Sequence, residues 1–184
     1  MPQPPPRRQP VGEHFASVVF CLFAVLLFGC SGTTWKHVRT TPGYQPPKNI
    51  AIAISVEVAG EGIDEGASEL RDSLADELRS RGIVARFVER PDGLVGTNAA
   101  ELRVVQWSMG SRWERYWMKK EGEGYIVVIV RTTSPDGHPG YSGVARGYVE
   151  GGWYGGSYLN SASAAGDAIA KAIATGTAER PQSQ

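Results

Sequence analysis

The sequence predicts an α+β domain in which a mainly antiparallel sheet of about five strands has two helices packed against it. Three observations predict this class. Runs of β-branched and apolar residues have the length of strands, two segments place apolar residues at helical spacing, and turns containing glycine and proline separate consecutive strands. The composition, with 41% hydrophobic and 21% charged residues, is ordinary for a globular protein, and 184 residues suffice for one domain.

The first predicted strand and helix follow each other after residue 49. Residues 50–58 (IAIAISVEV) are apolar and β-branched, as in a buried strand. Residues 63–81 repeat apolar side chains every three or four positions, and the segment begins with acids and ends with arginines, which suits the helix dipole. Gly82 is the expected helix stop, and residues 83–89 form a second predicted strand.

Four further elements complete the predicted domain. Residues 101–109 and 125–133 (YIVVIVRTT) are predicted strands, and a Ser-Pro-Asp-Gly turn then leads to a hairpin strand over residues 141–150. Residues 162–174 form an alanine-rich helix with Ser161 as its expected N-cap. The order β-α-β-β-β-β-α predicts a layered sandwich.

The N-terminus is typical of an export signal rather than of a folded domain. Residues 1–10 are rich in proline and contain two arginines, and residues 15–28 are uncharged and almost wholly apolar. This apolar run is too short for a bilayer span of about 20 residues, but it has the length of a signal-peptide core. Cys21 lies inside the run and Cys30 ends it, and these are the two cysteines of the chain. Cleavage before Cys30 would leave a single cysteine, which excludes a disulfide framework and a cysteine-based zinc site.

The run ends in Leu27-Phe28-Gly29-Cys30, which resembles the lipobox of bacterial lipoproteins. The matching features are a leucine three places before the cysteine, a small residue directly before it, and the cysteine itself, whereas Phe28 is bulkier than the usual residue. The resemblance implies a diacylglyceryl group on the sulfur of Cys30, cleavage before Cys30 by signal peptidase II, and anchoring to a membrane through the lipid. Ser31, which follows the cysteine, favours the outer membrane over the inner one.

The predicted organisation has four parts: a signal peptide over residues 1–29, lipidated Cys30 with a flexible tether over residues 30–48, a single domain over residues 49–178, and a polar tail over residues 179–184. The tether is predicted because residues 31–48 contain three prolines and no apolar periodicity. The order of elements in the domain resembles that of small bacterial envelope lipoproteins, whose relatives in architecture include the activators of peptidoglycan synthases and the curli-secretion lipoprotein. This resemblance carries over no functional residue.

No motif assigns catalytic, cofactor-binding or metal-binding residues, so we expect a protein that is not an enzyme and that holds no cofactor. Residues 60–66 (GEGIDEG) have the position of a phosphate loop, but acids stand where a phosphate would sit, so a loop and helix start is predicted there. A Ser-His-Asp arrangement would have to use Ser142, His138 and Asp136, which lack the nucleophile-elbow motif. The net charge of zero argues against a nucleic-acid partner.

The most unusual segment of the domain alternates aromatic and basic residues. It is a candidate contact surface for a partner, because tryptophan, tyrosine and arginine are enriched at interface centres, and its candidate residues are Arg112, Trp113, Arg115, Tyr116 and Trp117. The alternative is a long strand whose aromatic side chains pack in the core. A second aromatic group, Trp153, Tyr154 and Tyr158, lies in a glycine-rich loop, where it would stack on sugar rings or cover the end of the sheet.

These features favour a lipid-anchored envelope protein of binding or scaffold type, facing the periplasm or the cell surface. Its partners would be the membrane, through lipid on Cys30, and an envelope protein or cell-wall component. One alternative is an oligomeric accessory subunit of an export or envelope-assembly machine. A second alternative is a hydrolase with an unrecognised site.

Overall fold

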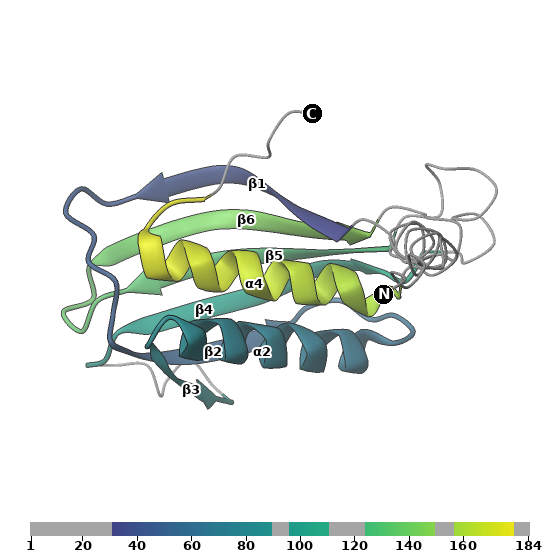
Figure 1. Ribbon diagram of the computed structural model, residues 1–184, viewed down its shortest axis with the longest axis horizontal. Coiled ribbons are helices and arrows are strands. Elements are labelled where there is room, and N and C mark those ends of the chain that lie inside the picture. The colour runs from purple at the N-terminus through teal and green to yellow at the C-terminus, as the bar shows by residue number, and fades with distance from the viewer. Residues whose placement is uncertain (1–30, 90–95, 111–123, 150–156, 179–184) are drawn as a thin grey trace, which may run out of the picture.

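The computed structural model describes residues 31–89, 96–110, 124–149 and 157–178. Two helices lie on one face of a six-stranded sheet (Figure 1). In chain order the elements are β1 (Ser31–Thr40), β2 (Asn49–Val56), α2 (Ile63–Ser80), β3 (Val84–Val88), β4 (Ala99–Ser108), β5 (Gly124–Thr133), β6 (Pro139–Val149) and α4 (Leu159–Thr175). The α+β class with two helices packed on a sheet is therefore confirmed.

The sheet is mixed, whereas the sequence analysis expects about five mainly antiparallel strands. Its order is β1-β6-β5-β4-β2-β3. Strands β1, β6, β5 and β4 pair antiparallel, but β2 runs parallel to both of its neighbours, β3 and β4. The pairing of β2 with β3 is parallel because helix α2 connects them. The helix returns the chain to the end of the sheet at which β2 began, and β3 starts from there.

The first strand replaces most of the expected tether. Residues 31–40 form β1, which pairs antiparallel with β6 from Ser31 opposite Val149 to Thr40 opposite Tyr141. Two side chains hold it in place: the Thr33 hydroxyl donates to the carbonyl oxygen of Ala164 on α4 at 2.8 Å, and Trp35 packs edge to face on Tyr141 of β6. An edge strand buries few side chains, so the sequence of β1 shows no apolar periodicity. The three prolines that suggested a tether lie after this strand.

The core lies between the helices and the strands, and glycines let the layers approach closely. A Cβ on Gly147 of β6 would lie 2.0 Å from the carbonyl oxygen of Ser161 on α4. Between the helices, a Cβ on Gly166 would lie 2.8 Å from the carbonyl oxygen of Leu70. The largest fully buried side chains come from both layers: Tyr141, Ile52, Leu70, Leu74, Leu78, Leu102, Ile126, Ile169, Ile173, Val104, Val128 and Val130.

The ends of the two helices differ slightly from the expectation. Helix α2 follows Gly62, whose φ of 70° is a left-handed conformation that suits glycine, so the expected helix start within residues 60–66 is confirmed. Helix α4 begins at Leu159, three residues earlier than expected, with Tyr158 at the N-cap position. The expectation that Ser161 caps this helix is therefore wrong, and its hydroxyl donates instead to the carbonyl oxygen of Tyr158 at 2.7 Å. Within the described ranges, neither helix has the length and apolarity needed to cross a bilayer.

Candidate interaction surfaces

The face of the sheet opposite the helices carries a strip of half-buried apolar side chains. Along β5 and β6 the fully buried positions alternate with half-buried ones, and the buried set faces the helices. The other set pairs across the two strands, with Tyr125 opposite Tyr148 and Ile129 opposite Val144. Because paired residues point to the same side of a sheet, these side chains and Val127 share one face. We call this surface the open sheet face.

Basic side chains surround the apolar strip. Strand register places six Lys and Arg residues of the described chain on the open sheet face, at Lys36, Arg39, Arg86, Arg103, Arg131 and Arg146. Arg146 lies over the ring of Tyr125, with its guanidinium carbon 4.9 Å from the ring centroid. Two carboxylates accompany these cations, Glu101 and Glu57, so the open sheet face is strongly basic.

One of the two carboxylates is fully engaged by an arginine. The guanidinium of Arg103 donates from Nε and Nη2 to the two oxygens of Glu57 at 2.6 and 2.7 Å. These hydrogen bonds lower the pKa of Glu57 and raise that of Arg103. Such an exposed pair stabilises the fold little, so its main effect here is on the charge of the surface.

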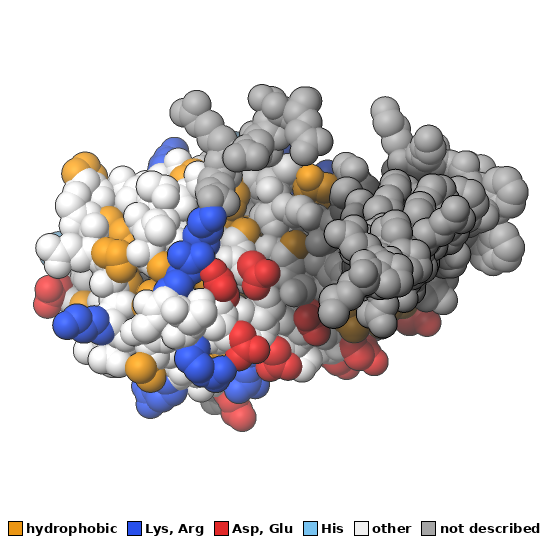
Figure 2. All heavy atoms as spheres, viewed as in Figure 1, with side chains coloured by type: hydrophobic (Ala, Val, Ile, Leu, Met, Phe, Trp, Pro, Cys, Tyr) orange, Lys and Arg blue, Asp and Glu red, His pale blue; other side chains and the backbone are white. Residues whose placement is uncertain are grey.

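The opposite side of the molecule is acidic. Figure 2 shows acidic side chains gathered over α2 on the helical face. The helix contains six acids and two arginines. Four of the acids, Glu65, Glu69, Asp72 and Asp76, recur at intervals of four, three and four residues, which places them on one side of the helix. We call these four residues the acidic stripe. Its last member pairs with Arg79 at 2.6 Å.

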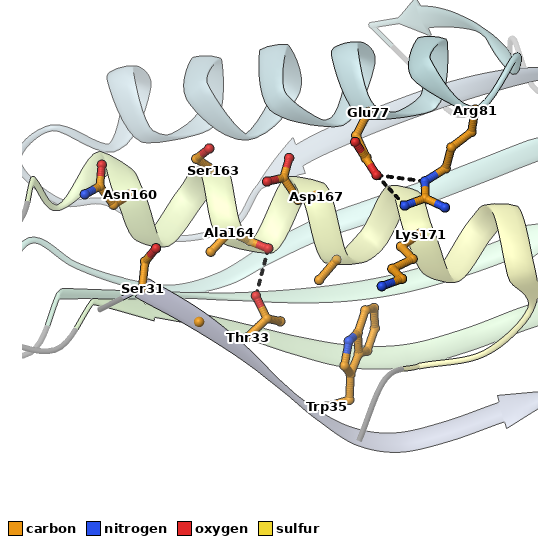
Figure 3. Close-up of a pocket in the computed structure, with 12 residues that line it drawn as sticks. Ser31, Thr33, Trp35, Glu77, Arg81, Asn160, Ser163, Ala164, Asp167 and Lys171 are labelled. Atoms are coloured by element: carbon orange, nitrogen blue, oxygen red, sulfur yellow. Dashed lines mark hydrogen bonds and ion pairs between the residues drawn. The ribbon is translucent and has the colours of Figure 1, made fainter. Parts of the chain in front are cut away.

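A polar groove of about 490 Å³ lies between β1, α4 and the last turn of α2 (Figure 3). Trp35 lies at one side, and Asp167 and Lys171 project from α4. Both carboxylates of the groove accept hydrogen bonds from the protein itself. The Ser73 hydroxyl donates to Asp167 at 2.5 Å, and Arg81 Nε donates to Glu77 at 2.8 Å.

A second hollow, of about 340 Å³, lies at the far end of the sheet near the turn between β5 and β6. Tyr44 lines it and donates from its hydroxyl to the carbonyl oxygen of Ile173 at 2.8 Å. Thr132, also in its lining, accepts from the Tyr141 amide at 2.6 Å. The hydroxyl of Tyr141 is buried and has no hydrogen-bond partner within the described chain, and burial raises the pKa of this group.

The comparisons with known proteins show the fold. No family model and no curated protein matches the chain. A solved structure does: a PelC dodecamer from Paraburkholderia phytofirmans, at a TM-score of 0.51 and 17% sequence identity, covers 82% of this chain and 100% of the PelC chain. The chain shares its fold with that PelC subunit. A second PelC dodecamer from the same organism, a Leu-to-Met variant, matches at a TM-score of 0.47 and 18% identity over 79% of this chain and 95% of its own.

The sequence-predicted site residues fall largely outside the described part of the chain. Cys30 lies one residue before β1. The candidate contact residues Arg112, Trp113, Arg115, Tyr116 and Trp117 lie in the connection between β4 and β5. Both expectations therefore stay predictions.

The residues that the sequence analysis considered for catalysis or ligand binding lie apart from one another or make other contacts. Asp136 and His138 are exposed in the turn after β5, where the His138 amide donates to Ser134 Oγ, while Ser142 is on the open sheet face opposite Arg131. Tyr158 packs edge to face on Trp107, whereas Trp153 and Tyr154 lie outside the described residues, so the role of that loop stays a prediction. No group of three or more potential metal ligands occurs among the described residues.

Sequence reasoning did not single out the open sheet face, although the sequence contains a signal for it. In the strand over residues 125–133, apolar side chains occupy both alternating sets of positions, so both faces of the strand are apolar. The two helices bury only one face of the six-stranded sheet. Apolar side chains on the other face are therefore a signal for a further contact on that face.

Proposed function

We propose that this protein is a lipid-anchored, non-enzymatic scaffold subunit of the bacterial envelope that works as a homo-oligomer. The observation that carries the proposal is the fold shared with a PelC subunit, which is matched over its whole length and which forms a dodecamer. This match favours the oligomeric accessory subunit over a binding protein that acts as a monomer.

The position of β1 gives the proposed lipid anchor a geometric consequence. Ser31 is already paired with Val149 in the sheet, so lipid on Cys30 would be attached within one residue of the folded domain. A tether of about 18 extended residues would reach roughly 60 Å from the membrane. Without most of that tether, the domain would rest against the membrane with the Ser31 end of the sheet toward the lipid.

The aromatic and basic segment is joined to the same end of the sheet. Strand β4 ends and β5 begins there, with Ser108 opposite Tyr125. Gly124 is in turn opposite Val149, which also pairs with Ser31. A contact made by residues 112–117 would therefore lie near the anchored end, where either lipid headgroups or a second envelope protein could be the partner.

Two measurements on the full chain test the proposal. The protein is expressed with its signal, and membranes are separated from soluble material before and after Cys30→Ala. We expect the wild type in the membrane fraction as a shortened, lipidated chain, and we expect the variant to keep residues 1–29, because cleavage requires the lipidated cysteine. Wild-type protein extracted in mild detergent should then show, by native mass spectrometry, a mass of several subunits. A soluble wild type would contradict the anchor, and a monomeric mass would contradict the scaffold.

A further inference from the structure

We infer that the open sheet face of one copy binds the acidic stripe on α2 of a second copy, so that subunits associate head to tail. The inference rests on the proposed homo-oligomer and names the two surfaces that meet. Its starting point is that opposite sides of one subunit carry opposite charge: six cations and two carboxylates on the open sheet face, against six acids and two arginines on α2.

The charges decide which surfaces can meet. Two open sheet faces placed against each other would bring arginines against arginines, and two α2 helices would bring carboxylates against carboxylates. Like charges in contact are unfavourable at an interface, whereas complementary potentials both steer and orient the encounter. A contact between the open sheet face of one copy and the acidic stripe of another avoids like charges and brings complementary charges together. Such a contact is heterologous, so a pair of subunits keeps one free face of each kind, and the chain of contacts closes into a ring when the rotation allows.

The size and chemistry of the open sheet face are those of an interface. Five strands about 4.8 Å apart and about ten residues long present roughly 800 Å². This is about the area that one partner contributes to a standard stable interface. The pair Ile129–Val144 lies near its centre, the pair Tyr125–Tyr148 lies toward its Ser31 end, and cations lie around both pairs. Tyrosine and arginine together are the residue types that most often dominate binding at interface centres.

The helix matches the strands in length and, at about 10 Å wide, would cover about two of the five. Helix α2 has 18 residues and is about 27 Å long, close to the length of the ten-residue strands, about 33 Å. The stripe faces away from the core, because Leu70, Leu74 and Gly66 are on the buried side of α2 while Glu65, Asp72 and Asp76 are exposed. The stripe is therefore accessible along the helix.

A charge-reversal exchange tests the inference. The sheet variant combines Lys36→Glu with Arg131→Glu, and the helix variant combines Glu69→Lys with Asp72→Lys. A control variant, Lys48→Glu with Asp136→Lys, reverses two exposed charges that lie on neither surface. Each is made in the full chain, extracted in mild detergent and examined by native mass spectrometry, and circular dichroism confirms that each is folded.

We expect the sheet variant and the helix variant each to be monomeric, and the control to keep the wild-type mass. Co-expression of the two variants with different tags should restore assembly, with the two chains in equal number. The reason is that the two carboxylates introduced on the sheet face of the first variant can pair with the two lysines introduced on the helix of the second, and the unchanged faces also match. Assembly of the wild type should weaken as salt is raised, because screening reduces the attraction between the faces.

Three outcomes would overturn the inference. Wild-type mass in both variants would show that other surfaces make the contact. Loss of assembly without recovery on co-expression would show that the two faces do not meet each other. Loss of membrane association in the sheet variant alone, with assembly intact, would assign the basic face to anionic lipid. A monomeric wild type would instead contradict the proposed function itself, so the two failures are distinguishable.

Discussion

Replacing Gly147 by alanine should destabilise the domain by about 3 kcal/mol, because α4 lies almost directly on the backbone of β6. The added Cβ would lie 2.0 Å from the carbonyl oxygen of Ser161 and 2.9 Å from the Cβ of Ala165. Unstrained non-bonded atoms lie about 3.5 Å apart, so the helix would have to retreat by more than 1 Å. Overpacking of this kind costs about 1–3 kcal/mol, and a backbone clash belongs at the upper end.

Helix α4 cannot retreat freely, since other contacts fix it from three sides. Its carbonyl oxygens accept hydrogen bonds from Thr33 on β1, Ser73 on α2 and Tyr44 before β2. Gly166 brings α2 into backbone contact with the same helix. Movement away from Gly147 would therefore break contacts with three other segments.

Thermal and urea denaturation measure the effect. For a domain of this size, about 3 kcal/mol corresponds to a fall in Tm of roughly 6–12 °C. The control is Gly137→Ala: no atom lies within 4 Å of its added Cβ, so the change costs only the backbone strain of a φ of 78°, about 1–2 kcal/mol. A Gly147→Ala protein that melts at the wild-type temperature would refute the close packing of α4 on β6.

Three further predictions follow from the chain. Mass spectrometry should find Cys30 acylated at the mature N-terminus, and an unmodified Cys30 or retained residues 1–29 would contradict the lipobox. Trp113→Ala and Trp117→Ala should leave the melt nearly unchanged and abolish partner capture, whereas a loss of about 3–5 kcal/mol in both would place these residues in the core. Tyr141→Phe should leave stability equal or higher, since it removes a buried hydroxyl that has no partner in the described chain. Burial raises the pKa of Tyr141 above its ordinary value of 10.0, so the native state keeps a proton that the unfolded chain releases. The wild type should therefore lose stability as the pH rises above about 10, and the variant should lose less, as measured by urea denaturation at about pH 8 and about pH 11.

The surfaces proposed to act could be recognised only in part from the sequence. The spacing within residues 63–81 predicts the helix, and with it the set of acids on its outer side. The six cations of the open sheet face are spread over residues 36–146. They meet on one face only through strand pairing, for example Lys36 with Val144 and Arg131 with Ser142.

The sequence by itself determined the elements whose own side chains fix their conformation. The helical spacing of residues 63–81 and the β-branched segment 125–133 each contain their signal within about 20 consecutive residues. Tertiary structure alone decided the role of residues 31–40 and the parallel placement of β2 beside β4. An edge strand with few buried side chains has no periodicity of its own, and β1 is held by partners far along the chain, such as the Thr33 hydroxyl and the Ala164 carbonyl, 131 residues apart. Local sequence shows which face of an element is apolar, but the free energy of long-range pairing decides what covers that face.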